Sequence, residues 1–372
     1  TSAGTRVGHS AYSYANATGG SLLVGANGSD SYAGGSALVN ATMGTGNVLA
    51  ITGSTSLTAS NRTRQTAVTS GVTVGGLLAL GANLADADAG SVTLASIDHG
   101  TTGTVCDALS VVATGHDETS ADAEAGSGGI IAGAAAVAST RNLSDTQALL
   151  GGGAAADALV TDSGGRMEVR ADHMATFNAR VDSLSAGVVG ASGAQARNDI
   201  DAKVVAGIRA GAHLNTWDLD VYALNQTRKP WLTRAEGAAL VDVFNVFAGA
   251  GGLAGGAAGS SETRVDNITR VEVGDSARVS VLGDPDDAGR SNFNAVSDVM
   301  LRDRAKLEAG GAISAADAES IIEVNINPLT TAAGDVGQTE ARIGSNVVID
   351  TVGDFNLATR ENVDVEARAS SK

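Results

Sequence analysis

The sequence repeats itself six times, and this repetition restricts the possible folds more than any other feature. Its clearest marker is a pair of small residues followed by two aliphatic residues, as in Gly75-Gly76-Leu77-Leu78. The second small residue stands at positions 20, 76, 129, 187, 252 and 311, so successive copies are 53 to 65 residues apart. Tandem units of this length predict a repeat architecture in which each unit buries its apolar face against its neighbours.

A second marker, a short apolar-x-apolar strand that closes on Ala or Gly, gives the same period of about 58 to 60 residues. Agreement between two separate markers predicts six degenerate units. The copies of the strand marker are 57–59, 111–113, 167–171, 219–223, 279–283 and 355–358. The approximate units are 15–70, 71–124, 125–182, 183–247, 248–306 and 307–372.

Within each unit the apolar residues alternate with polar ones or form short runs, as at Val68, Val72 and Val74. Strands of four to seven residues, interrupted by Gly, Asn, Asp and Ser, indicate an all-β chain. The longest step of the strand marker contains Phe293, Val296, Met300 and Leu307 at helical spacing, which predicts a short helical insertion at about 284–318. A second segment, 233–247, begins with a capping-box pattern, and the sequence supports helix and strand equally there.

A right-handed parallel β-solenoid, or β-helix, accounts for the repeats and for the composition. The chain has 49 glycines but only 2 Trp, 4 Tyr and 5 Phe, so its core must be thin and filled by small residues. With coils of about 20 residues, each unit would form two to three coils, and sixteen to eighteen coils would make a rod of about 80 Å. The alternative is a string of β-sandwich modules, whose cores would be marginal at this size.

The charge and the composition exclude several classes of function. A formal charge of −17 disfavours binding to nucleic acid, and no apolar run is long enough to span a bilayer. The single cysteine, Cys106, excludes an internal disulfide framework and is expected to be a small buried residue. The chain has no initiating Met and no signal-peptide pattern, so Thr1 is interpreted as the start of a fragment or of a processed product.

An acidic turn is the strongest candidate site for a ligand. Asp284, Asp286 and Asp287 place three carboxylates within four residues, and hard oxygen ligands of this kind bind calcium. Calcium is therefore the one cofactor that the sequence suggests. The alternative interpretation is that the three carboxylates form a solvated turn without a metal. Asp86 and Asp88 alternate with alanines, so both carboxylates should lie on one face of a strand, where they could bind cations or remain solvated.

The sequence offers no catalytic constellation. His9, His99, His116, His173 and His213 are scattered without the spacing of a metal site, and no nucleophile elbow or phosphate-binding loop is present. Acidic and basic residues are dispersed through every repeat, whereas a carbohydrate-active β-helix would need them clustered on one face. We therefore expect a protein that is not an enzyme. Seven Asn-x-Ser/Thr triplets, at Asn16, Asn27, Asn40, Asn61, Asn142, Asn225 and Asn267, are potential glycosylation sites.

The repeats resemble those of giant bacterial filamentous adhesins, the hemagglutinin-like and leukotoxin-A-type surface proteins. The similarity lies in strands that close on alanine, at 169–171 and 221–223, and in small-residue blocks at 75–83 and 128–134. It implies a secreted, repetitive, β-helical and non-enzymatic protein at the bacterial cell surface. The insertion near 284–318 and the lack of a recognisable secretion domain depart from that family.

The sequence is compatible with three functions. The first is an extracellular structural or adhesive rod, part of a surface adhesin or fibre, whose partners are adjoining repeats, surface glycans or other cells. The second is a self-assembling subunit of a homopolymeric filament, because a solenoid without caps exposes strand edges at both ends. The third is a carbohydrate-active β-helix.

Overall fold

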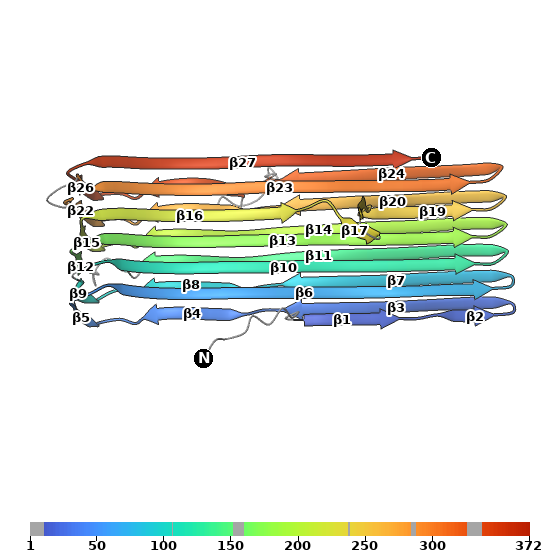
Figure 1. Ribbon diagram of the computed structural model, residues 1–372, viewed down its shortest axis with the longest axis horizontal. Coiled ribbons are helices and arrows are strands. Elements are labelled where there is room, and N and C mark those ends of the chain that lie inside the picture. Colours follow the sequence, from blue (N-terminus) through green and yellow to red (C-terminus); the bar gives the residue numbers. More distant parts are fainter. Residues whose placement is uncertain (1–10, 106, 152–159, 237–238, 284–287, 326–336) are drawn as a thin grey trace.

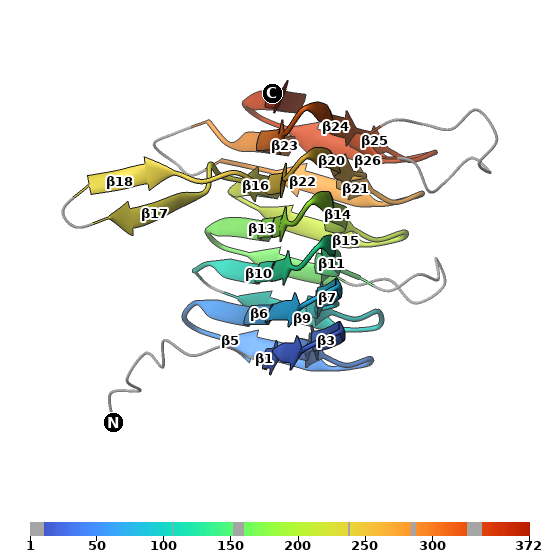
Figure 2. The same cartoon turned by 90° about the vertical axis from the view of Figure 1, so that its right-hand side faces the viewer.

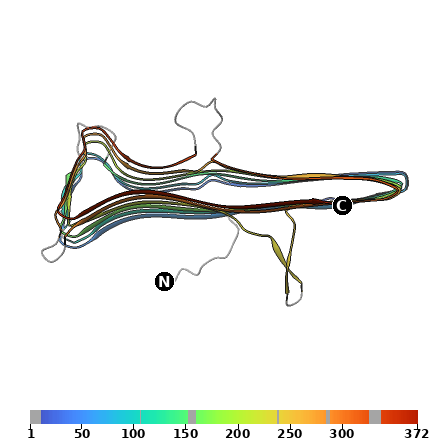
Figure 3. The same cartoon turned by 90° about the horizontal axis from the view of Figure 1, so that it is seen from above.

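The computed structural model describes residues 11–105, 107–151, 160–236, 239–283, 288–325 and 337–372. Within these residues the chain forms strands and no helix, and it winds into a right-handed parallel β-helix (Figures 1 and 3). The coils stack from the N-terminus to the C-terminus, and an antiparallel hairpin projects from the side of the stack (Figure 2). The predicted all-β solenoid is confirmed.

Two long sheets face each other and a short third sheet closes one end. Sheet A contains β1 (Ala11–Asn16), β2 (Gly19–Ser21), β6 (Thr55–Gly75), β10 (Leu109–Gly128), β13 (Arg166–Ala186), β16 (Asp218–Lys229), β19 (Val246–Gly251), β23 (Arg290–Gly310) and β27 (Asp354–Ser371). Sheet B contains β3 (Val24–Gly35), β4 (Leu38–Met43), β7 (Leu78–Ala89), β8 (Val92–Ile97), β11 (Ile131–Leu150), β14 (Val189–Ile208), β20 (Ala254–Val265), β21 (Ile268–Val273), β24 (Ile313–Val324) and β25 (Gln338–Ile343).

Sheet C is made of four-residue strands, one from each coil. Its members are β5 (Val48–Ile51), β9 (Thr102–Val105), β12 (Val160–Ser163), β15 (His213–Thr216), β22 (Arg278–Val281) and β26 (Val348–Thr351). The projecting hairpin consists of β17 (Thr233–Glu236) and β18 (Ala239–Asp242).

One sequence repeat is one coil, so the prediction of two to three coils per repeat is wrong. Equivalent residues in sheet A are Ala59, Ala113, Ala171, Ala223, Ala295 and Thr359, which makes each coil 52 to 72 residues long. The strands of sheet A reach 21 residues, or about 70 Å, whereas six coils stack to only about 30 Å. The molecule is therefore a slab whose longest axis follows the strands, not a rod of about 80 Å along the stack (Figure 1).

The small-residue marker lies at the tight turn from sheet A to sheet B, and the structure shows why glycine is needed there. A Cβ atom on Gly187 would lie 2.5 Å from the carbonyl oxygen of Gly129 in the preceding coil, and one on Gly252 would lie 1.9 Å from that of Gly187. The turns therefore stack backbone against backbone. In the first coil the marker is displaced by two residues, because Gly20 pairs with Val74 and Leu22 occupies the equivalent position.

The predicted helical insertion at 284–318 is wrong over its described residues, because β23 and the start of β24 occupy them. Burial alternates without a break from Ser291 to Leu307, so Phe293 and Val299 point inward while Val296 and Met300 point outward. The true extra length lies earlier, between Ala223 and Ala295, where the β17–β18 hairpin interrupts the coil. The strand marker at 279–283 was therefore misassigned, since β22 belongs to sheet C and its sheet A counterpart begins at Phe293.

The core changes in character from one end of the coil to the other (Figure 3). Where sheet C holds the long sheets apart, the interior is filled by large side chains such as Ile97, Leu150, Met167 and Phe293. Towards the glycine turns the long sheets converge, and the buried cluster is made mostly of alanine. A narrow interior accepts only small side chains, which explains why the chain folds with so few aromatic residues.

Candidate functional site

The C-terminal end of the stack leaves the interior open. Val363 on β27 points inward and is 50% exposed, whereas Val299, its partner one coil below, is fully buried. Leu357 and Val365 are exposed in the same way above Phe293 and Leu301. Within the described residues no element covers this end (Figure 2), so apolar side chains and unpaired strand edges face solvent together.

Among the residues from Ala11 onward that the structure describes, nothing covers the N-terminal end of the stack either. Its edge consists of β1, β3, β4 and β5, and the inward residues Val39, Ala41 and Met43 pack on the core while remaining partly exposed. Their equivalents in the second coil, among them Ala95 and Ile97, are fully buried. Each end therefore presents half of a coil-to-coil interface.

A buried polar cluster lies between the two parts of the core. The carboxylate of Asp117 accepts hydrogen bonds from the hydroxyls of Ser91 (2.6 Å), Ser144 and Thr63. His173 places Nε2 3.8 Å from the same carboxylate, while its Nδ1 lies 3.2 Å from the hydroxyl of Thr146. Burial lowers the pKa of His173, and the negative charge of Asp117 opposes that shift.

This cluster places a hydroxyl, an imidazole and a carboxylate in the order found in hydrolytic triads. Thr146, His173 and Asp117, however, are all at least 98% buried, so no substrate can reach the hydroxyl. The three hydroxyls that donate to Asp117 satisfy a carboxylate that would otherwise be buried without partners. The cluster therefore serves to hold sheets A and B together.

A second buried charge lies two coils further along. The ammonium of Lys229 donates to Asp303 over 2.6 Å and to the hydroxyl of Thr263 over 2.8 Å. Ser261 and Ser320 donate to the same carboxylate. Lys229, Asp303 and Asp117 were not predicted from the sequence, although each stands at an odd-numbered position, as the inward-facing residues of its strand do.

The predicted calcium ligands Asp284, Asp286 and Asp287 lie outside the described residues, as do His9 and Cys106. Asp86 and Asp88 do share the outer face of β7, as predicted. Ser139 donates a hydrogen bond to Asp86, and the hydroxyl of Tyr32 donates to Asp88 over 3.3 Å. In the described part of the chain, no three His, Cys, Asp or Glu side chains come together as a metal site.

Two further histidines, His116 and His213, lie outside the buried cluster. His116 lies on the outer surface of β10, where burial and the charge of Arg62 lower its pKa. His213 is exposed at the start of β15. Of the potential glycosylation sites, Asn142, Asn225 and Asn267 point into the core and are at most 1% exposed, so the folded chain cannot carry glycans there.

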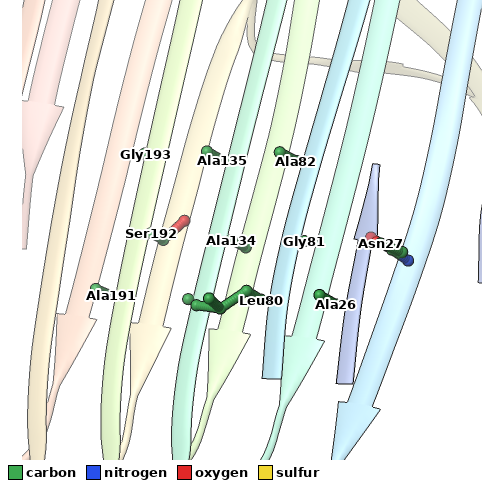
Figure 4. A pocket seen from close by; sticks show the side chains of 11 residues that line it. Ala26, Asn27, Leu80, Gly81, Ala82, Ala134, Ala135, Ala191, Ser192 and Gly193 are labelled. Carbon is green, nitrogen blue, oxygen red and sulfur yellow. The ribbon is translucent and has the colours of Figure 1, made fainter. Parts of the chain in front are cut away.

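Shallow grooves cross the outer face of sheet B near the glycine turns. One is lined by Gly, Ala, Asn27, Ser192 and Leu80, without a titratable side chain (Figure 4). The hydroxyl of Ser192 is buried and donates inward to the carbonyl of Ser183 over 2.8 Å, so it is not available as a nucleophile. This groove can accept an apolar surface but offers no acid, base or nucleophile for catalysis.

Comparisons of the chain with protein-family models, with curated proteins and with solved structures found no match. Among the described residues, no helix is sufficiently long and apolar to cross a membrane.

Proposed function

We propose that this chain is an extracellular structural or adhesive segment of a bacterial surface adhesin or fibre, and that its coils stack end to end. The observation that carries the proposal is the pair of open ends, each of which exposes inward-facing apolar side chains along unpaired strands. In parallel β-sheets such edges pair with further strands. The location at the cell surface rests on the resemblance to filamentous adhesins.

The columns of inward residues support a head-to-tail arrangement. Met43, Ile97, Leu150, Ile208, Val273 and Ile343 occupy one such column, from the first coil to the last. If the column continued from one copy to the next, Met43 would lie on Ile343, and β1 of the added copy would leave sheet A because residues 365–370 of β27 already occupy that layer. By the same register Ala41 would lie on Ala341, so that apolar residues meet apolar residues.

A homopolymeric filament built from separate subunits is the second candidate, and the same end-to-end match favours it. The two functions differ in whether the isolated chain polymerises. In a longer adhesin the ends are joined to further repeats, whereas a filament subunit must find its neighbours in solution. The size distribution of the isolated chain therefore separates them.

Two lysine substitutions at adjacent positions test the stacking. Val363→Lys places a charge over the open interior, where the monomer tolerates it because the site is half exposed, but where a stacked copy would bury it. Asn362→Lys is the control, since Asn362 lies on the same strand and points outward. We expect the parent chain and Asn362→Lys to form fibres under the electron microscope, and Val363→Lys to form none while its circular dichroism stays unchanged.

The results distinguish the two assemblies. Fibres that Val363→Lys abolishes would support a filament subunit. Folded proteins that form no fibres in all three cases at millimolar concentration would contradict self-stacking and favour a segment of a longer chain. Binding of chain-coated beads to a glycan array tests adhesion, and an array without signal would restrict the protein to a structural role.

A further inference from the structure

Every coil carries a segment without charge across its glycine turn. Although the chain has 24 basic and 41 acidic residues, none occurs in these six segments. Because the turns lie above one another, the uncharged segments form one continuous edge of the slab (Figures 1 and 3). The segments are 19–29, 65–85, 125–140, 183–196, 243–261 and 309–316.

The outer face of sheet B next to these turns forms a broad apolar surface, which we call the turn-side face. It comprises the outward residues of 24–30, 78–84, 131–137, 189–195 and 254–260. Its floor is a column of five small residues that runs across the strands, parallel to the stacking axis. The column consists of Gly28, Ala82, Ala135, Gly193 and Ala258.

Large aliphatic side chains border and interrupt this floor. Ile131 and Val189 stand on the side of the turns, and Leu84 and Val137 stand on the opposite side. Leu80 rises beside the floor and is the one large aliphatic side chain among the residues labelled in Figure 4. Leu80, Ile131 and Val189 are each 46 to 47% exposed, which is unusual for neighbouring aliphatic residues on a monomer.

We propose that two copies of this chain pair laterally through their turn-side faces. The area is sufficient for a stable dimer: four columns of side chains across five strands cover about 600 to 700 Å² per copy, or about 1,200 to 1,400 Å² in the pair. A two-fold axis would bring the same surface of both copies together, so that Leu80 of each enters the Gly and Ala floor of the other.

Charge favours a second copy over other occupants. Two chains of formal charge −17 repel one another over most of their surfaces, whereas the turn-side face carries Asp30, Asp317 and Glu319 only along its rim. A bilayer is disfavoured, because the uncharged segments contain no Trp, Tyr, Lys or Arg of the kind that anchors proteins at lipid interfaces. The lateral pairing uses a different surface from the end-to-end stacking and does not depend on it.

Two glycines with equal space around them provide a matched test. A Cβ atom on Gly193 or on Gly251 would meet no atom within 4 Å, so lysine fits the fold at both positions. Gly193 lies on the floor of the turn-side face, whereas Gly251 lies beside the same turns on sheet A. Both substitutions are made in the Val363→Lys background, so that end-to-end stacking does not contribute to the measured mass.

Sedimentation equilibrium then reports the lateral pairing alone. We expect the background protein and Gly251→Lys to rise in mass with concentration from one chain (36.7 kDa) towards two, and Gly193→Lys to dimerise at least tenfold more weakly. A background protein that stays monomeric at millimolar concentration would overturn the proposal. So would an equal loss of dimer in both glycine variants, or flotation of the background protein with phosphatidylcholine vesicles that both variants abolish.

Discussion

Lys229 and Asp303 form a fully buried ion pair, with Nζ of Lys229 2.6 Å from Oδ1 of Asp303, although 74 residues separate them in the sequence. They come from adjacent coils, and hydroxyls from sheet B complete the hydrogen bonding of both charges. Burial of the ammonium lowers the pKa of Lys229, and Asp303 opposes that shift. The pair therefore fixes the alignment of two coils within an interior that penalises any unpartnered charge.

Replacing Asp303 alone should destabilise the fold far more than replacing Lys229 and Asp303 together. Asp303→Ala leaves the ammonium of Lys229 buried with one neutral acceptor, and we expect it to lower the free energy of unfolding by about 3 to 5 kcal/mol. The double variant Lys229→Met/Asp303→Leu should recover most of this loss. Urea denaturation at pH 7 measures both, and a double variant as unstable as Asp303→Ala would contradict the interpretation.

The loss in Asp303→Ala should also depend on pH. Its folded state keeps Lys229 at a lowered pKa, so between that pKa and about 10.4 the unfolded chain binds more protons, and stability rises with pH. We expect the difference in unfolding free energy between this variant and the parent chain to become smaller from pH 7 to pH 10. A difference of constant size would show that the ammonium charge is not the cause.

The stacked turns predict opposite outcomes for two glycines in the same coil. Gly187→Ala drives a methyl group against the carbonyl oxygen of Gly129 and should cost about 1 to 3 kcal/mol. Gly193→Ala enters open space and should change stability by at most about 0.5 kcal/mol. Thermal unfolding followed by circular dichroism compares the two variants. Equal losses of stability would contradict the close contact between the Gly187 and Gly129 backbones at the turn.

His173 should make the protein sensitive to mild acid. Its folded pKa lies below the unfolded value of about 6.5, so the unfolded chain binds the extra proton between these values, and stability falls as the pH drops through that window. His116, Asp117 and Asp145 supply the neighbouring charges. The slope of unfolding free energy should reach at most about 1.4 kcal/mol per pH unit.

Replacing this imidazole should remove most of that slope. His173→Asn keeps a polar side chain without a titrating proton, and the exposed His213→Asn is the control that should retain the slope of the parent chain. Urea denaturation at several pH values between 4 and 7 provides the measurement. An unchanged slope in His173→Asn would assign the acid sensitivity to another group.

The β17–β18 hairpin should be dispensable. In β13 only three residues, 178–180, separate the part in register with β16 from the part that pairs with β19. In the next coil the corresponding connection, from β16 to β19, takes residues 230–245. Replacing 230–245 by Asn-Ala-Arg, the sequence of 178–180, would restore an uninterrupted strand from Lys229 to Val246. We expect β-sheet circular dichroism and a melting temperature within a few degrees of the parent chain, and loss of the folded signal would show that the hairpin stabilises the stack.

The period, the strand content and the stacked turns were predictable, because glycine at a backbone-to-backbone contact and alternating burial both leave regular marks in a sequence. The length of the strands was not. Asn61, Thr63 and Gln65 look like strand breaks, yet they are inward residues within the single strand β6. A polar interior thus made one long coil resemble several short ones.

The buried charges were missed for a related reason. Lys229, Asp303 and Asp117 are residue types that are almost always exposed, and only their parity within the strand marks them as inward. Parity was equally decisive at β23, where Phe293, Val296 and Met300 match a helical period by chance. Following the alternation from Ser291 onward would have identified both the strand and the buried Asp303.

Because each coil is one turn of 52 to 72 residues, the fold also has a mechanical consequence. The backbone hydrogen bonds run along the stack, so tension applied to the two termini peels one coil at a time from an end. Each detached coil, fully extended, yields about 170 to 250 Å of slack in place of a rise of about 5 Å. Under load the slab would lengthen in large steps, and the work of detaching each coil would be dissipated while the remaining coils stay folded.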